Sequence, residues 1–269
     1  MELINNMQAD ILEQLGRFGF LAVSQFRMLT GKSVGYIREM LGSLKRKGYI
    51  NSYRIEVSYK VRAENIYFLT PQGKEFLLSH KNVFADDIKL PLAKNPVVTK
   101  DYWHRLSFIT LHIHLYKYLL ECNAPLIAFY AYFDKVGNVK AGTLTAKTKI
   151  PLAKGVSYIP DGVMITGERL YLLEMYCDKD TKRIINQLAL HAQAITLATP
   201  AKTFDVQDDP LVLSVFAHAS IKQAVIKRLT QNEGFAAVSS LYFFATLEDV
   251  TNDIATAFTT IQNTQLLIR

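Results

Sequence analysis

The chain has 269 residues, of which 49% are hydrophobic and 20% are charged, a composition that excludes disordered and collagen-like proteins. Its two cysteines, Cys122 and Cys177, are isolated, which excludes a disulfide framework and favours a reducing cytoplasm. No apolar run approaches the ~18 residues of a membrane span, and the opening segment MELINNMQAD lacks a signal-peptide pattern. We therefore expect a cytoplasmic protein without membrane contact, and the length favours two domains.

The net charge of +7 is concentrated in the first third of the chain. Residues 1–100 carry 15 basic and 9 acidic groups, whereas residues 101–269 carry 16 and 15. Residues 17–62 contain ten basic side chains and only two acidic ones, Glu39 and Glu56. A cationic surface of this density favours a polyanionic partner, most simply DNA. The alternative is a basic face that is merely solvated.

Residues 10–47 have the apolar spacing of three short amphipathic helices, which we expect at about 10–19, 22–30 and 33–47. Gly31 permits a tight turn between the second and third helices, and Ser33 caps the third. The buried stripe of the third helix consists of Val34, Ile37, Leu41 and Leu44. Its outer face is polar and basic, and consists of Gly35, Tyr36, Arg38, Ser43, Lys45 and Arg46.

A hairpin and a fourth helix follow. Alternating residues predict strands at about 53–57 and 66–68 around a tip that contains Lys60 and Arg62. Thr70-Pro71 then starts a helix with a capping side chain and a proline in its first turn. The run LKRKGYINSYR…IYFLTPQGKEFL resembles winged helix-turn-helix DNA-binding domains.

This resemblance implies that the third helix enters the major groove while the wing touches the DNA backbone. The implied DNA-binding residues are Lys32, Ser33, Tyr36, Arg38, Ser43, Lys45, Arg46, Lys47, Arg54, Lys60 and Arg62. Winged helices also act as protein–protein adaptors, which is the alternative. We expect this domain at residues 1–80 and a linker with two prolines at 81–100.

Residues 101–269 alternate helices and strands, which predicts an α/β domain with an embedded antiparallel hairpin and a mixed central sheet. The overall class expected is therefore α+β. The predicted helices are 101–121, 180–197, 219–231 and about 247–262, and the predicted strands are 126–133, 157–165, 170–177, 211–217 and 240–246. The last helix is either a dimer surface or a cover for the sheet.

Two carboxylates are predicted to face each other in the hairpin. If Gly167-Glu168 form a two-residue loop, the two residue numbers of each cross-strand pair add up to 335. Asp161 then falls opposite Glu174. Like charges so placed need compensation, for which a divalent metal such as Mg²⁺ or Mn²⁺ is the simplest candidate. A loop shifted by one residue would instead place Asp161 and Glu174 on opposite faces, and half-exposed strand ends are a second alternative.

The pattern Pro160-Asp161, apolar hairpin, Glu174 resembles the PD-(D/E)xK restriction-endonuclease-like superfamily. The resemblance implies that Asp161 and Glu174 bind the metal, and that a lysine two residues after the second acid positions the attacking water. Tyr176 occupies that position here, so Lys179 or Lys182 would have to substitute. Without such a substitute, the resemblance implies a domain that binds DNA and metal but does not cleave DNA.

Both halves together resemble the replication-relaxation family of bacterial plasmid and integrative-element proteins, through YWHRLSFITLHIHL, YIPDGVMI and YLLEMY…DTKRIINQL. The implied partners are double-stranded DNA at a plasmid or mobile-element origin and other relaxosome proteins. The implied activity is metal-dependent nicking, and the alternative is a non-catalytic regulator or accessory protein. His104 matches a family histidine, with a site-supporting or a packing role.

Two other arrangements received little support. His112 and His114 lie two apart in a predicted helix, so they point away from each other and do not suit a joint metal site. Tyr176 is a conceivable nucleophile, but a tyrosine on a buried strand is more often a core residue.

Overall fold

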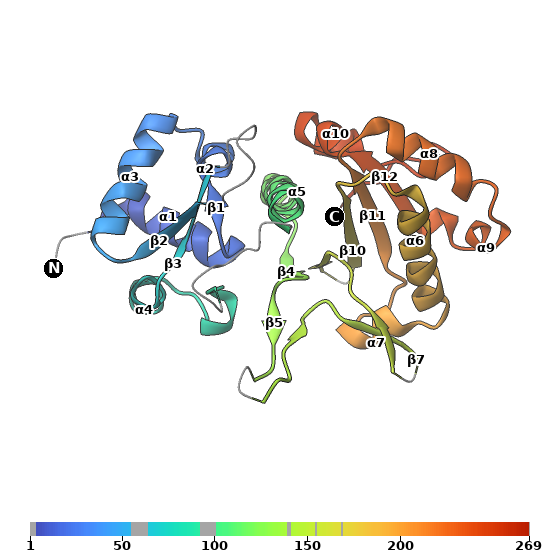
Figure 1. Ribbon diagram of the computed structural model, residues 1–269, viewed down its shortest axis with the longest axis horizontal. Helices are drawn as coiled ribbons and strands as arrows, with labels where there is room; N and C mark the ends of the chain where they lie inside the picture. The colour runs from blue at the N-terminus through green and yellow to red at the C-terminus, as the bar shows by residue number, and fades with distance from the viewer. Residues whose placement is uncertain are drawn as a thin grey trace. The chain divides into compact units, whose positions relative to one another are not determined.

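The computed structural model describes residues 4–54, 64–91, 101–138, 141–153, 155–167 and 169–268 (Figure 1). The chain divides into two compact units, Met1–Ile113 and His114–Arg269. The division falls inside a long helix, α5 (Tyr102–Glu121), whereas the sequence placed the boundary in the segment 81–100. Residues 92–100 of that segment lie outside the described residues.

The first half of α5 belongs to the first unit because a buried glutamine holds it there. The Gln25 side chain donates to the Leu106 carbonyl (3.0 Å) and to the Thr110 hydroxyl (3.2 Å). Its Oε1 also accepts from the Ala22 amide, at the start of the helix that carries it. The Gln25 side chain is 1% exposed and makes all three of these hydrogen bonds, so it links its own helix to α5 without leaving a buried polar group unsatisfied.

The first unit contains a three-stranded sheet with the strand order β1-β3-β2. Its elements are α1 (Asn6–Phe18), β1 (Leu21–Ala22), α2 (Val23–Thr30), α3 (Val34–Arg46), β2 (Ile50–Arg54), β3 (Asn65–Leu69), α4 (Pro71–His80) and the short η1 (Ala85–Asp87). The four predicted helices are confirmed. The hairpin β2/β3 pairs Ile50 with Leu69 and Arg54 with Asn65. Strand β2 begins three residues before the predicted start at Tyr53, and residues 55–63, which include the end of that predicted strand and Lys60 and Arg62 of the predicted tip, lie outside the described residues.

Local signals determine how these helices begin and end. Gly31 has φ +68° and ends α2, a conformation that costs glycine little. The Ser33 hydroxyl accepts from the Tyr36 amide and caps α3, as predicted. On the inner side of α3, Ile37, Leu41 and Leu44 are buried. The outer face of α3 is therefore set by helical periodicity around this stripe.

The second unit is built on a mixed five-stranded sheet with the order β12-β11-β10-β9-β4. Its strands are β4 (Leu126–Ala131), β9 (Gly162–Thr166), β10 (Arg169–Tyr176), β11 (Leu211–Phe216) and β12 (Tyr242–Thr246). β10, β11 and β12 are parallel, whereas β9 runs antiparallel to both β10 and β4. The predicted mixed sheet with its embedded hairpin is confirmed.

Two helices, α6 (Thr181–Thr196) and α8 (Ala219–Leu229), cover one face of this sheet (Figure 1). Ile184 and Leu188 of α6 and Val225 of α8 enter the same buried cluster as Leu172 and Val212 of the sheet. This apolar layer forms the core of the second unit. None of the helices in the described ranges has the length and apolarity that crossing a membrane requires.

The predicted helix over 247–262 is wrong. The structure has two short helices, α10 (Leu247–Asn252) and α11 (Ile254–Ala257), separated by Asp253 in an extended conformation. The Asp253 side chain accepts from the Ala255 amide and so caps the second helix. Thr259 then forms a backbone bridge to Phe244 of β12. The apolar residues of this segment, such as Val250 and Phe258, are buried within the unit and cover its sheet.

Small elements complete the unit. They are β5 (Lys135–Val136), β6 (Thr145–Ala146), β7 (Ile150–Ala153), β8 (Val156–Tyr158), α7 (Thr199–Phe204), α9 (Glu233–Ala236) and η3 (Ser239–Leu241). Two of them, β8 and η3, overlap the strands predicted over 157–165 and 240–246, which are therefore shorter in the structure, and the others were not predicted. These elements have two to six residues, which is too short for a hydrophobic period to be recognised.

Candidate functional site

The hairpin β9/β10 has the predicted register. Thr166 pairs with Arg169 and Val163 with Leu172, so the paired numbers sum to 335. The ladder ends at Gly162 opposite Leu173, and Asp161 is the next residue beyond it. Its Oδ2 accepts from the Met175 amide at 2.8 Å, which places the carboxylate beside the Glu174–Met175 end of β10.

Glu174 is engaged by a histidine that the sequence analysis did not single out. The Glu174 Oε1 lies 2.7 Å from Nε2 of His191 on α6. Glu174 is 2% exposed and His191 is 0% exposed, so the pair lies in the interior of the second unit. His191 extends the buried stripe of Ile184 and Leu188, and that spacing was a signal in the sequence.

The imidazole of His191 is neutral at physiological pH. Burial lowers the pKa of His191 to about 3. A second proton on Nδ1 would also find no acceptor, since this buried atom has no hydrogen-bond partner among the described residues. We therefore assign the contact as a hydrogen bond donated by His191 Nε2–H to the Glu174 carboxylate, rather than an ion pair.

Three tyrosines surround this pair. Burial and the nearby charge of Glu174 raise the pKa of Tyr158, Tyr176 and Tyr242, so all three phenols stay protonated. The Tyr242 hydroxyl donates to the Leu188 carbonyl at 3.2 Å, and the Tyr158 ring meets the His191 ring edge-on at 4.8 Å. A phenolate nucleophile at Tyr176 is disfavoured by this environment.

Neither predicted lysine reaches the carboxylates through a contact among the described residues. Lys179 precedes α6 and Lys182 lies in its first turn, and both side chains are exposed. Lys182 is two residues before the buried Ile184, so it lies on the opposite face of the helix. From α6, the side chain that reaches Glu174 is His191.

The donor set does not fit a catalytic Mg²⁺ or Mn²⁺ ion. In the described part of the chain, no three His, Cys, Asp or Glu side chains are grouped as metal ligands. Mg²⁺ keeps several waters when it is bound by one or two carboxylates. Glu174 is enclosed at 2% exposure with His191 on Oε1, and Asp161 Oδ2 is bonded to the Met175 amide. We derive no metal-dependent step from this arrangement.

The predicted DNA-binding residues lie on and around α3 in the first unit. The exposed ones are Lys32, Ser33, Tyr36, Arg38, Lys45, Arg46 and Arg54. Ser43 and Lys47 are half-buried, and Lys60 and Arg62 lie outside the described residues. We call these exposed residues of α3 and its flanking segments, five of which are basic, the α3 face.

Three of the predicted residues bond to side chains of neighbouring elements, and one of these three, Lys45, is also exposed. The Ser43 hydroxyl accepts from Nε2 of Gln8 on α1 at 3.0 Å, and Lys47 Nζ donates to Gln8 Oε1 at 3.5 Å. Lys45 Nζ donates to the Ser52 hydroxyl of β2 at 2.7 Å. The side chains of Tyr36 and Arg38, by contrast, are exposed near the start of α3.

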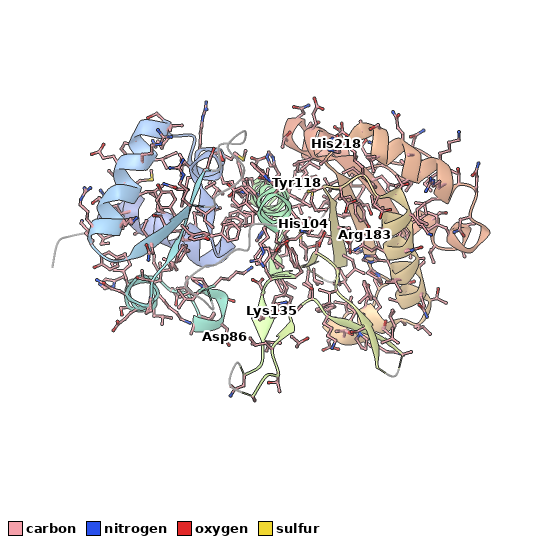
Figure 2. All side chains as sticks on the ribbon, viewed as in Figure 1. Asp86, His104, Tyr118, Lys135, Arg183 and His218 are labelled. Carbon is pink, nitrogen blue, oxygen red and sulfur yellow. The ribbon has the colours of Figure 1, made fainter. Side chains whose placement is uncertain are left out.

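The three histidines considered from the sequence all lie on α5. His104, labelled in Figure 2, has its Nδ1 3.6 Å from an oxygen of Asp101, the residue that precedes the helix. His112 is buried with its ring against Phe18 at 4.6 Å, and His114 is half-buried. Burial lowers the pKa of His112 and of His114.

Searches against protein-family models, curated proteins and solved structures found no match to this chain. The function is therefore argued from its residues.

Proposed function

We propose that this chain is a double-stranded DNA-binding protein that docks the α3 face in the major groove. The observation that carries the proposal is the combination of a capped helix, a rigid buried side and a basic exposed side. Ser33 starts the helix, Leu41 and Leu44 hold it on the core, and Arg38 is exposed. Helices presented in this way read base edges with their first turns.

The order of elements supports the same proposal. Helix α1, strand β1, helices α2 and α3, and the hairpin β2/β3 follow one another as in winged helix-turn-helix domains. The charge of this segment also supports the proposal, because residues 17–62 carry ten basic and two acidic side chains. Neutralising DNA phosphates with such side chains releases counterions, which supplies sequence-independent affinity.

For the second unit we propose a nuclease-like fold without nuclease activity. The order α5, β4, β9, β10, α6, β11 resembles that of PD-(D/E)xK domains, and supports descent from such an enzyme. The buried Glu174–His191 hydrogen bond and the exposed Lys179 and Lys182 favour the non-catalytic version. On this proposal the protein is a regulator or accessory factor at a plasmid or mobile-element origin.

The test combines selection of duplexes from a random pool with anisotropy measurements on the selected duplex. We expect Arg38→Ala and Tyr36→Ala to weaken binding about tenfold each and to relax the preference at specific base pairs. The matched control is Arg228→Ala, which removes one exposed positive charge from α8. Unchanged affinity and preference in both α3 variants would refute the proposal.

A further inference from the structure

An acidic side chain, Glu39, lies in the middle of the outer side of α3. Helix α3 packs on the first unit through Ile37 and Leu41, which are buried. Glu39 is two residues from each of them, about 200° around the helix, so it points away from the core. Arg46 follows Glu39 by seven residues and returns to the same side. Both side chains are exposed, so Glu39 shares the surface that we expect to meet DNA.

The charge of Glu39 is opposite to that of its surroundings. It is the one acidic residue of α3, which also carries Arg38, Lys45 and Arg46. Basic side chains on this surface attract DNA phosphates, and a carboxylate among them opposes that attraction. The position of Glu39 therefore needs an explanation other than general affinity for a polyanion.

The helix gains little of its own stability from Glu39. Acids stabilise a helix when a base lies three or four residues away. The residues at those four positions are Gly35, Tyr36, Gly42 and Ser43, none of which is basic. Acids also stabilise the first turn of a helix, but Glu39 is the sixth residue of α3 and lies beyond that turn.

Tertiary contacts do not engage Glu39 either. Among the described residues, its carboxylate makes no hydrogen bond or ion pair. Other carboxylates of the first unit hold the fold together: Glu13 pairs with Lys81 at 3.4 Å, and Glu64 Oε2 accepts from the Ser24 hydroxyl at 2.9 Å. Glu39 thus keeps its full capacity to accept hydrogen bonds from a ligand.

The helix surface beside Glu39 is open. Gly35 and Gly42 lie four residues before and three residues after it, so both are its neighbours on the helix. A Cβ built at Gly35 meets none of the described residues within 4 Å, and one built at Gly42 meets only Nη1 of Arg46, at 3.5 Å. A base edge can therefore approach the Glu39 carboxylate without a clash with these neighbours.

The chemistry of a carboxylate selects one base in the major groove. An ionised carboxylate only accepts hydrogen bonds, so it needs a donor on the base edge. Guanine and thymine present acceptors there, and adenine presents its amino donor beside the N7 acceptor. Cytosine presents its N4 amino donor without an acceptor of its own, which makes it the best partner for Glu39.

We propose that Glu39 reads a cytosine in the major groove by accepting a hydrogen bond from its N4 amino group. The inference rests on the proposed function, which supplies the groove. On other sequences the carboxylate faces acceptors or phosphates without a donor, so it lowers the affinity for those sequences. Glu39 thereby sets the preference at one base pair, whereas the basic residues of the α3 face supply affinity.

The experiment selects duplexes from a random pool with the full chain and its variants in parallel, followed by anisotropy on the selected duplex with each base at every position. We expect the wild type to prefer cytosine at one pair by about tenfold, and Glu39→Ala to lose that preference alone. Glu39→Gln should shift the preference to adenine, because an amide bonds to both N6 and N7 of that base. The matched control is Glu75→Gln, which removes an exposed acid from α4 and should select the wild-type sequence.

Failure of the inference can be separated from failure of the proposed function. Selection of the wild-type sequence by both Glu39 variants, with binding still weakened in Arg38→Ala, would overturn the inference and leave the α3 proposal standing. Equal changes of preference in Glu39→Gln and Glu75→Gln would also overturn it, since the charge would then act without contact. Unchanged binding in both Arg38→Ala and Tyr36→Ala would instead refute the proposed function, and the inference with it.

Discussion

Glu174 on β10 and His191 on α6 form a 2.7 Å hydrogen bond in the interior of the second unit. In a metal-dependent nuclease this carboxylate would have to meet an ion and water, but here it meets a neutral imidazole at 2% exposure. The contact thereby joins the helix to the sheet that it covers, and its primary contribution is to stability.

Breaking this pair should destabilise the protein. We expect His191→Leu to lower the free energy of unfolding by about 3–5 kcal/mol, because it leaves a carboxylate buried without its donor. Glu174→Ala should cost about 3 kcal/mol, and Glu174→Gln, which keeps an acceptor, about 1 kcal/mol. Urea denaturation of the full chain measures all three.

A double variant tests whether the two residues act through each other. The cycle compares Glu174→Leu, His191→Leu and the variant that carries both substitutions. The double variant should lose less free energy of unfolding than the two single leucine variants lose together, with a coupling of about 2 kcal/mol. Additive losses would show that each residue contributes only its own packing.

Divalent ions should neither bind at Asp161 and Glu174 nor support cleavage there. We expect no saturable heat from millimolar Mg²⁺ or Mn²⁺, and no nicking of supercoiled plasmid, because Oε1 of Glu174 is bonded to His191. Nicking that disappears in both Asp161→Ala and Glu174→Ala would restore the nickase hypothesis.

Acid should destabilise the first unit through His112. Burial, followed by the charges of Lys89 and Arg17, lowers its pKa well below 6.5, so the unfolded chain takes up this proton first. Stability is therefore fully present above pH 6.5 and falls as the pH drops below that value.

The measurement compares the wild type with His112→Leu between pH 7 and 4.5. Below about pH 6, the wild type should lose up to ~1.4 kcal/mol per pH unit more than the variant. Parallel wild-type and His112→Leu curves would exclude His112 as the source.

Replacing two glycines of the first unit by alanine should change the stability of the protein in opposite directions. A Cβ at Gly73 would overlap the Tyr49 carbonyl oxygen, so Gly73→Ala should cost about 2 kcal/mol or more. At Gly35 of α3 no atom lies within 4 Å of a built Cβ, so Gly35→Ala should gain ~0.5–1 kcal/mol. Thermal unfolding distinguishes the two, and a destabilising Gly35→Ala would contradict the assigned helix.

Much of the fold was predictable because its signals are local. The glycine-first loop at Gly167 set the pairing of β9 with β10, and the apolar stripe Ile37, Leu41, Leu44 set which face of α3 is buried. The final segment was not predictable from its period. Apolar spacing does not show where a helix is interrupted. Here the backbone at Asp253 is extended, which ends α10, and the Asp253 side chain caps the start of the separate helix α11.

The candidate site was only half predictable for a related reason. Short-range geometry placed Asp161 beside the end of β10, but the partner of Glu174 comes from a helix 17 residues further along the chain. Which side chain of α6 reaches the sheet depends on how the helix packs, and that selected His191 over Lys182.

The sequence alone determined the location of the positive charge, the helix faces and the strand register, because these follow from composition and from periods of 3.6 and 2 residues. Tertiary structure alone decided what the carboxylates contact. Burial converts Glu174 from a candidate metal ligand into a hydrogen-bond acceptor of His191. This outcome depends on how α6 packs on β10: the spacing of Ile184, Leu188 and His191 places the histidine on the buried face of the helix, but it does not determine which side chain the histidine meets.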